Sequence, residues 1–154
     1  MSKFLLPVTS SELASDVAAL INAGQQLCFR QTSYSILSNS TTYLIKLHLN
    51  KVVGVIGLEQ CSNTVTELKH LCVDPEYRGR GIGLSLLKEG VIYASTPYVF
   101  GKVGSDNAVN IRNNLRAGFK PIAKVRGRNR YIIIFARRKN GRSKQNILYN
   151  SNRK

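Results

Sequence analysis

Apolar positions near the start of the chain form first a short run and then a helical period. The run at residues 4–8 predicts a strand. A helix is expected after it, opened by a capping box at residues 9–12, closed by Gly24, and apolar along the face of Leu13, Val17, Leu20 and Ile21. Residues 25–40 are polar and weakly patterned, and they predict either a second short helix or a loop over a site.

Alternating apolar and polar positions then predict an antiparallel meander. Its strands cover residues 43–49, 52–58 and 64–73, and Asp74-Pro75 breaks the pattern. The glycine-rich turn at residues 78–83 leads into a helix with Leu84, Leu87 and Val91 on one face.

Strands and helices alternate through the rest of the chain. A strand is expected at residues 98–103, a helix at 108–117, and a final strand pair at 120–125 and 131–136. This order predicts one α/β (α+β) domain over residues 1–138, followed by a basic, flexible tail at 139–154.

The composition fits one globular domain. The chain has 154 residues, 43% of them apolar, which is enough to bury a core. No apolar run approaches the roughly 20 residues of a membrane span, and the stretch before Pro7 is too short for a signal peptide. The 3 cysteines show no CxxC spacing, so we expect no metal site and a reducing, cytoplasmic setting.

Positive charge is concentrated in the last third of the chain. The formal net charge is +15, and residues 107–154 carry 14 lysines and arginines with no acidic residue. Such an excess favours a polyanionic partner, because binding relieves repulsion and releases counterions. A nucleic acid or a nucleoprotein is therefore a candidate partner, and a solvated, solubilising surface is the alternative.

The turn at residues 78–83 carries the clearest chemical signal. A glycine-rich turn between a strand and a helix directs several backbone N–H groups at one point, which suits a phosphate or pyrophosphate. The Gly-Lys-Ser/Thr signature of nucleotide triphosphatases is absent, and Leu84 stands where a dinucleotide fingerprint needs its third glycine. The pattern present is R-x-x-G-x-G, formed by Arg78, Gly81 and Gly83.

With this pattern the chain resembles the GNAT superfamily of acetyl-CoA-dependent N-acetyltransferases. Residues 71–83, LCVDPEYRGRGIG, look like the central motif of that family. Asn107, eleven residues before Gly118-Phe119, is similar to its second motif, and the element order over residues 3–137 matches. The resemblance implies a GNAT fold, with a mixed central sheet of about seven strands flanked by helices.

The resemblance also implies acetyl-CoA as co-substrate, with no metal. The strand before the turn is expected to splay from its neighbour and to pair with the pantetheine arm through Leu71, Cys72 and Val73. The pyrophosphate is expected on the turn, at Arg78, Gly79, Arg80, Gly81, Ile82 and Gly83. Asn107 is expected to contact the pantetheine.

The candidate catalytic base is Glu67, on the strand that leads to the turn. In the histone acetyltransferase branch of the family, a glutamate at this offset activates the amine through water; an ordinary surface position is the alternative. The sequence departs from the family at Asn114, where many relatives have a tyrosine that protonates the departing thiolate. Substitutes for that tyrosine are Tyr98, Tyr131 and Ser105, which the sequence does not rank.

The acceptor is expected near the turn of the last strand pair. Arg126, Arg128 and Arg130 would repel cationic acceptors and attract phosphates. The leading hypothesis is an N-acetyltransferase that acts on a nucleic acid or on a protein bound to one. The alternatives are a non-catalytic nucleic-acid-binding or assembly module with the same fold, and a ribosomal-type protein N-terminal or lysine acetyltransferase.

Overall fold

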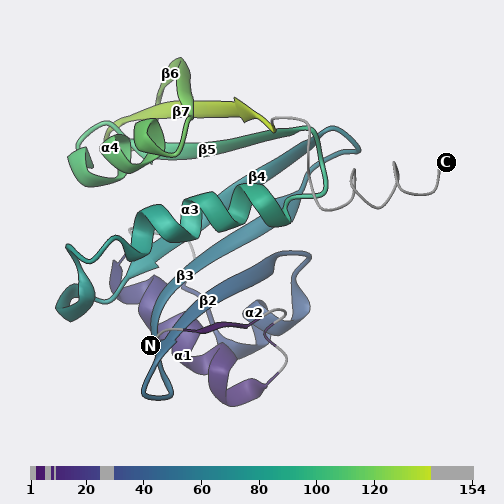
Figure 1. Ribbon diagram of the computed structural model, residues 1–154, viewed down its shortest axis with the longest axis vertical. Helices are drawn as coiled ribbons and strands as arrows, with labels where there is room; N and C mark the ends of the chain where they lie inside the picture. The colour runs from purple at the N-terminus through teal and green to yellow at the C-terminus, as the bar shows by residue number, and fades with distance from the viewer. Residues whose placement is uncertain (1–2, 6–7, 9, 25–29, 140–154) are drawn as a thin grey trace, which may run out of the picture.

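The computed structural model describes residues 3–5, 8, 10–24 and 30–139. Within them, one seven-stranded sheet has the order β1-β2-β3-β4-β5-β7-β6 (Figure 1). β4 and β5 pair in parallel, and the other neighbours pair antiparallel, which confirms the predicted mixed sheet. The strands are β1 (Lys3–Leu5), β2 (Thr42–His48), β3 (Lys51–Gln60), β4 (Val65–Val73), β5 (Tyr98–Gly104), β6 (Lys120–Arg126) and β7 (Tyr131–Arg138).

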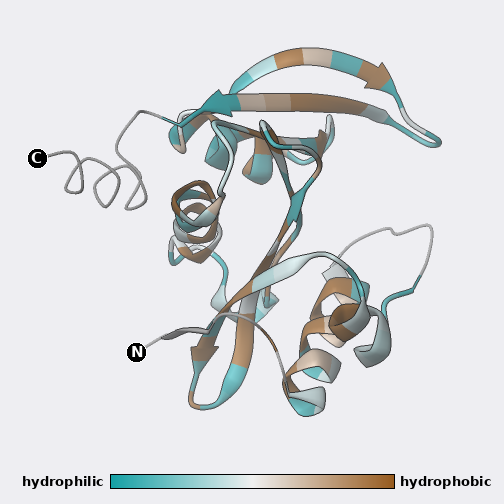
Figure 2. Cartoon of the chain, turned by 90° about the vertical axis from the view of Figure 1, so that its right-hand side faces the viewer, coloured by the Kyte–Doolittle hydropathy of each residue, from teal (hydrophilic) through white to brown (hydrophobic). Residues whose placement is uncertain are grey.

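Helices cover both faces of the sheet (Figure 2). α1 packs against β3 and β4 from one side, with α2 beside it, and α3 packs against the same two strands from the other side, with α4 beside it. The helices are α1 (Ser11–Gly24), α2 (Ser33–Ser38), α3 (Ile82–Tyr93) and α4 (Ala108–Arg116), and a single turn of 3₁₀ helix, η1 (Pro75–Tyr77), precedes α3.

The predicted elements are all present, with small shifts at their ends. The first strand covers Lys3–Leu5 rather than residues 4–8. The hydroxyl of Ser10 accepts a hydrogen bond from the backbone N–H of Leu13 and so caps α1, whereas Thr9 lies outside the described residues. The predicted tail lies outside them as well, except for Lys139.

Two apolar cores stabilise the fold, one on each side of the sheet. The core under α1 contains Val17, Ile21, Tyr43 and Val55, and the core under α3 contains Ile56, Leu68, Leu86 and Phe135. β3 contributes to both, because its successive side chains point to opposite faces. This double burial explains why the β3 segment reads as an almost continuous apolar run.

β4 and β5 separate part-way along their length. Their parallel pairing runs from Val65–Tyr98 to Leu68–Gly101 and then ends. Beyond that point β4 continues along β3, and β5 continues along β7. The sheet is therefore open between residues 69–73 and residues 102–104, as the sequence resemblance implies.

A β-bulge lies where the two strands part. Val55 pairs with Cys72 and Gly57 pairs with Lys69, so β4 holds one residue more than β3 between these pairs. His70, inside the bulge, has a φ of 56°, a left-handed conformation that costs a non-glycine residue on the order of 1–3 kcal/mol. Such strain persists only when the surroundings enforce it, and here the His70 ring stacks on Tyr43 with 6.1 Å between the ring centroids.

Candidate functional site

The turn between β4 and α3 is shaped by left-handed glycines. Gly79 and Gly81 have φ values of 76° and 77°, and Gly81 caps α3 without any side-chain hydrogen bond. The first backbone N–H groups of α3 therefore face outward, at the positive end of the helix dipole. This arrangement suits an anion, as the sequence pattern predicts.

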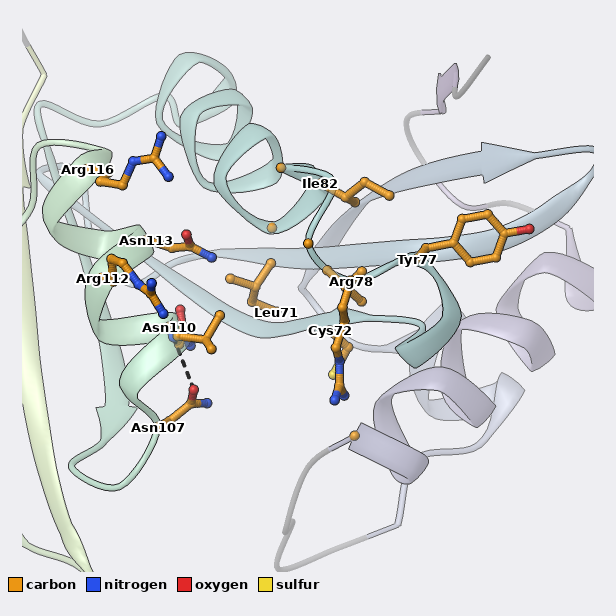
Figure 3. Close-up of a pocket in the computed structure, with 16 residues that line it drawn as sticks. Leu71, Cys72, Tyr77, Arg78, Ile82, Asn107, Asn110, Arg112, Asn113 and Arg116 are labelled. Atoms are coloured by element: carbon orange, nitrogen blue, oxygen red, sulfur yellow. Dashed lines mark hydrogen bonds between the residues drawn. The ribbon is translucent and has the colours of Figure 1, made fainter.

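A cavity of about 490 Å³ lies in front of this turn (Figure 3). It is lined by nine of the ten residues that the resemblance assigns to the cofactor: Leu71, Cys72, Val73, Arg78, Gly79, Gly81, Ile82, Gly83 and Asn107. Gly83 also allows α3 to approach α4 closely, because a Cβ there would lie 3.2 Å from the side-chain nitrogen Nδ2 of Asn113. The tenth residue, Arg80, does not line the cavity, since its guanidinium lies over the ring of Tyr77 at 4.9 Å from the centroid.

Helix α4 forms the opposite wall of this cavity. Asn107 caps α4, and its side-chain oxygen accepts a hydrogen bond of 3.1 Å from the backbone N–H of Asn110. Arg112 and Arg116 extend from the same helix toward the cavity (Figure 3). From the sequence, these two arginines were recognisable only as part of the excess positive charge.

A second cavity, of about 470 Å³, occupies the opening between β4 and β5. It is lined by Glu67 and His70 from β4, Lys102 from β5, and Asn114 from α4. Leu71 and Asn110 line both cavities, so the two spaces adjoin through the gap in the sheet. A ligand bound by the glycine turn can thus reach a group beside Glu67.

The carboxylate of Glu67 is mostly buried, with a side-chain exposure of 16%. It lies 3.4 Å from the ammonium of Lys102, whose own side chain is 55% exposed. The Glu67 carboxylate lines the second cavity, within reach of a group bound there, which is the position that a general base requires.

Asn114 is buried, and its amide is already engaged. Its exposure is 2%, and its side-chain nitrogen donates to the backbone oxygen and the side-chain oxygen of Asn110, at 2.8 and 2.9 Å. The three residues suggested as substitutes for the missing tyrosine, Tyr98, Tyr131 and Ser105, line neither cavity.

His70 and Tyr43 form a polar pair at the edge of the second cavity. The hydroxyl of Tyr43 lies 3.1 Å from Nδ1 of His70. Burial raises the pKa of Tyr43 and lowers the pKa of His70, so both groups are neutral near pH 7. The sequence analysis did not single out this pair, since nothing in the local pattern reveals a contact between residues 27 positions apart.

The arginines of the last hairpin lie apart from both cavities. Arg126, Arg128 and Arg130 line neither of them. Arg130 instead forms an ion pair of 3.1 Å with Asp106, and Arg126 lies over the ring of Tyr131. The hairpin turn extends to the side of the sheet that α1 and α2 cover (Figure 2).

The described residues offer neither a metal cluster nor a membrane-spanning helix. They contain no group of three or more histidine, cysteine, aspartate or glutamate side chains placed to hold a metal ion. In the same part of the chain, no helix combines the length and the hydropathy needed to cross a membrane.

Comparison with known proteins identifies the fold family. The sequence model of the acetyltransferase (GNAT) family matches residues 14–119, more than half of the chain. The chain belongs to the GNAT acetyltransferase family. The turn at residues 78–83 and the gap between β4 and β5 lie within the matched region.

Solved structures agree with this assignment. A putative acetyltransferase of Salmonella typhimurium, solved with its cofactor acetyl-CoA, superposes with a TM-score of 0.75 at 16% identity, covering 91% of this chain and 96% of that one. A ribosomal-protein-alanine N-acetyltransferase from Brucella melitensis superposes with a TM-score of 0.73 at 17% identity, covering 87% and 99%. At these identities the likeness concerns the GNAT fold alone.

One relative is more similar in sequence over a shorter region. An uncharacterized protein of Mycobacterium leprae is 34% identical over 74 residues, which is 46% of this chain and 21% of that protein. The matched region spans about a fifth of the length of that relative.

Proposed function

We propose that this GNAT protein is an N-acetyltransferase that transfers an acetyl group from acetyl-CoA to an amine. The observation that carries the proposal is the adjoining pair of cavities, one formed by the glycine turn and the other by Glu67, which meet at Leu71 and Asn110. When bound, acetyl-CoA supplies a thioester, whose acetyl carbon an amine can attack.

The residues of the first cavity fit acetyl-CoA. Convergent N–H groups at the start of α3 suit the pyrophosphate, and Arg78, Arg112 and Arg116 add positive charge around the same space. The side chains of Leu71 and Ile82 offer apolar surface to a pantetheine arm. Cys72 serves as part of this wall rather than as an acetyl-carrying nucleophile.

The second cavity supplies the acid–base chemistry. Glu67 accepts the proton of the acceptor amine, directly or through water, and Lys102 holds the carboxylate in an ion pair of 3.4 Å. Asn114 stands at the position of the tyrosine that protonates the departing thiolate in many relatives. Its amide donates to Asn110 and does not replace that tyrosine. A thiolate is a good leaving group, so solvent serves as the proton source.

The proposed acceptor is a nucleic acid or a protein associated with one. The net charge of +15 and the lack of acidic residues after residue 106 support a polyanionic partner. A ribosomal-type protein acetyltransferase is a second candidate, favoured by the likeness of the fold to the Brucella melitensis enzyme. The free thiol of Cys61 agrees with a reducing, cytoplasmic location.

A graded series at Gly83 tests the cofactor site. Its Cβ position faces the cavity between Asn113 and Val73, and its φ is not left-handed, so larger side chains fit the helix but occupy the site. Gly83→Ala is expected to weaken acetyl-CoA binding in calorimetry, and Gly83→Leu to abolish it. Both variants are expected to retain a cooperative thermal unfolding transition, which shows that they are folded. Undiminished binding to the leucine variant would show that the cofactor lies elsewhere.

A turnover assay separates the enzyme from a non-catalytic module. Release of CoA from acetyl-CoA is followed with candidate acceptors: ribosomal proteins, their N-terminal peptides and RNA. An N-acetyltransferase releases CoA in proportion to the acetylated acceptor. Asparagine in place of the usual tyrosine at position 114 favours the alternative, a non-catalytic binding module. Such a module would bind acetyl-CoA in calorimetry but release no CoA with any acceptor.

A further inference from the structure

A third concave surface lies on the α3 side of the sheet and shares no lining residue with the second cavity. It is a groove of about 790 Å³ bounded by the second half of α3, the end of α4, the start of β6 and the end of β7. In Figure 1 these elements surround the region between α3 and the β5–β7–β6 arm. We call it the basic groove, because its charged lining residues are Lys88, Arg116, Lys120, Arg137 and Arg138.

The charge of the basic groove is not neutralised by the protein. No acidic residue lines it, and in the described part of the chain none of its five cations forms an ion pair with a carboxylate. Lys88, Arg116, Lys120 and Arg138 are exposed. Five like charges gathered on one concave surface attract counterions strongly, and they favour a ligand that can replace several of those counterions at once.

One of these cations is held in place by the fold. The guanidinium of Arg137 donates a hydrogen bond of 2.5 Å to the carbonyl oxygen of Ala117, just after α4. The guanidinium also passes close to Gly118, with Nη1 at 3.3 Å from the position that a Cβ would occupy. The wall of the groove is thus preorganised, and less side-chain entropy is lost when an anion binds.

The floor of the groove is apolar. Val91 and Ile92 of α3, together with Ala117 and Ala136, lie between the charged side chains. Ile92 is 52% exposed and adds apolar surface to the groove. Exposed cations around this apolar surface suit a polymer whose phosphates can contact several of them at once.

We propose that the basic groove binds the phosphate backbone of a nucleic acid. The proposal rests on the polyanionic partner of the proposed function and gives that partner a surface. The sequence placed this contact at the turn of the β6–β7 hairpin, whereas the groove lies at the opposite end of the same hairpin, at Lys120 and Arg138. The nucleic acid therefore docks on the α3 side, while acetyl transfer takes place at the gap between β4 and β5.

The test compares two variants that each remove three positive charges. The groove variant is Lys88→Gln/Lys120→Gln/Arg138→Gln, which leaves Arg116 of the cofactor cavity and the anchored Arg137 in place. The turn variant is Arg126→Gln/Arg128→Gln/Arg130→Gln. Both are measured in the full chain by fluorescence anisotropy with a labelled 20-nucleotide RNA of mixed sequence between 0.05 and 0.3 M salt, after thermal melts confirm folding.

The groove variant is expected to lose affinity by about a hundredfold at 0.1 M salt. Its plot of log affinity against log salt is expected to be shallower by about two, because each phosphate contact on a single strand contributes about 0.7 to the slope. The turn variant is expected to change much less. Equal affinity of the groove variant and the unmodified protein, or a loss confined to the turn variant, overturns the proposal.

Calorimetry with acetyl-CoA separates this proposal from the proposed enzymatic function. Unchanged acetyl-CoA affinity in the groove variant, together with lost RNA binding, supports a separate nucleic-acid surface. Loss of acetyl-CoA binding in the groove variant assigns the groove to the cofactor and overturns the proposal. If the unmodified protein binds RNA but no acetyl-CoA, the enzymatic function fails while the groove proposal stands.

Discussion

The hydroxyl of Tyr43 and Nδ1 of His70 lie 3.1 Å apart and share a hydrogen bond. The side-chain nitrogen of Asn39 donates to the same hydroxyl at 3.4 Å, and the side-chain oxygen of Asn39 accepts from the backbone N–H of Thr41. A chain of hydrogen bonds thus runs from the loop before β2 to a residue that lines the second cavity.

His70 should make the stability of the protein depend on pH just below neutrality. Burial lowers its pKa below 6.5, with Lys69 acting in the same direction and Glu59 against it. As the pH falls through 6.5, the unfolded chain therefore takes up this proton first, and the free energy of unfolding decreases until the lower pKa of the folded state is reached.

The variant His70→Asn checks this dependence, because asparagine tolerates the left-handed φ but does not titrate. Urea denaturation at several values between pH 5 and pH 7.5 should show a flatter profile for the variant. Parallel profiles would mean that His70 does not cause the loss of stability.

Asp74 should stabilise the glycine turn through its charge. Its carboxylate accepts a hydrogen bond from Lys51 and a second one from the backbone N–H of Glu76, and both lower its pKa below 3.8. A lowered pKa means that this stabilisation is present above pH 3.8 and is lost as the pH falls through the folded-state pKa.

Two substitutions at Asp74 separate charge from capping. Asp74→Asn keeps a capping side chain and should flatten the dependence of unfolding free energy on pH between 2 and 5. Asp74→Ala also loses the cap, at a further cost of about 0.5–2 kcal/mol, and should weaken acetyl-CoA binding because η1 leads directly into the turn. Equal stability of the two variants at pH 7 would argue against the capping role.

Arg112 and Arg116 should recognise the phosphates of the cofactor rather than its pantetheine arm. The double variant Arg112→Gln/Arg116→Gln removes two cations from the wall of the first cavity. Its affinity for acetyl-CoA in calorimetry should fall at least about tenfold, since a hydrogen bond to a charged group contributes about 1.5–3 kcal/mol. Its affinity for S-acetylpantetheine, which has no phosphate, should stay the same; an equal loss for both compounds would contradict phosphate recognition.

Glu67 should affect turnover without affecting cofactor binding. Glu67→Gln keeps the size of the side chain but cannot accept a proton, so kcat with an identified acceptor should fall by about 10²–10⁴-fold. Lys102→Met, the matched control, removes the ion pair but leaves the carboxylate in place, so it should lower kcat much less. Full activity of Glu67→Gln would place the base elsewhere.

The glycine turn was predictable because its signal is local. Gly79 and Gly81 are needed for their positive φ, and Arg78 lies within reach of the same anion, so the motif contains its own geometry. The neighbouring Arg80 has the same charge and lies in the same motif, yet it packs on Tyr77. The direction of the Arg80 side chain depends on the backbone conformation of η1, which the sequence of the motif does not reveal.

The wall formed by α4 was missed, although the sequence does contain a signal. Asn110, Asn113 and Arg116 follow Asn107 at intervals of three residues, and all four line the first cavity. Successive residues at that spacing are neighbours on a helix surface, so the four form a slanted row along α4. Which face meets the cavity is decided by the packing of α4 on α3, and that packing is a tertiary property.

The sequence by itself determined the order of strands and helices, the glycine turn and the surplus of positive charge. Periodicity and glycine conformation are properties of a few neighbouring residues, and composition does not depend on the fold at all. Tertiary structure decided where β4 leaves β5, that His70 meets Tyr43, and how the basic residues divide among the hairpin turn, the cofactor cavity and the basic groove. Each of these depends on contacts between residues far apart in the chain, and only the packed sheet brings those residues together.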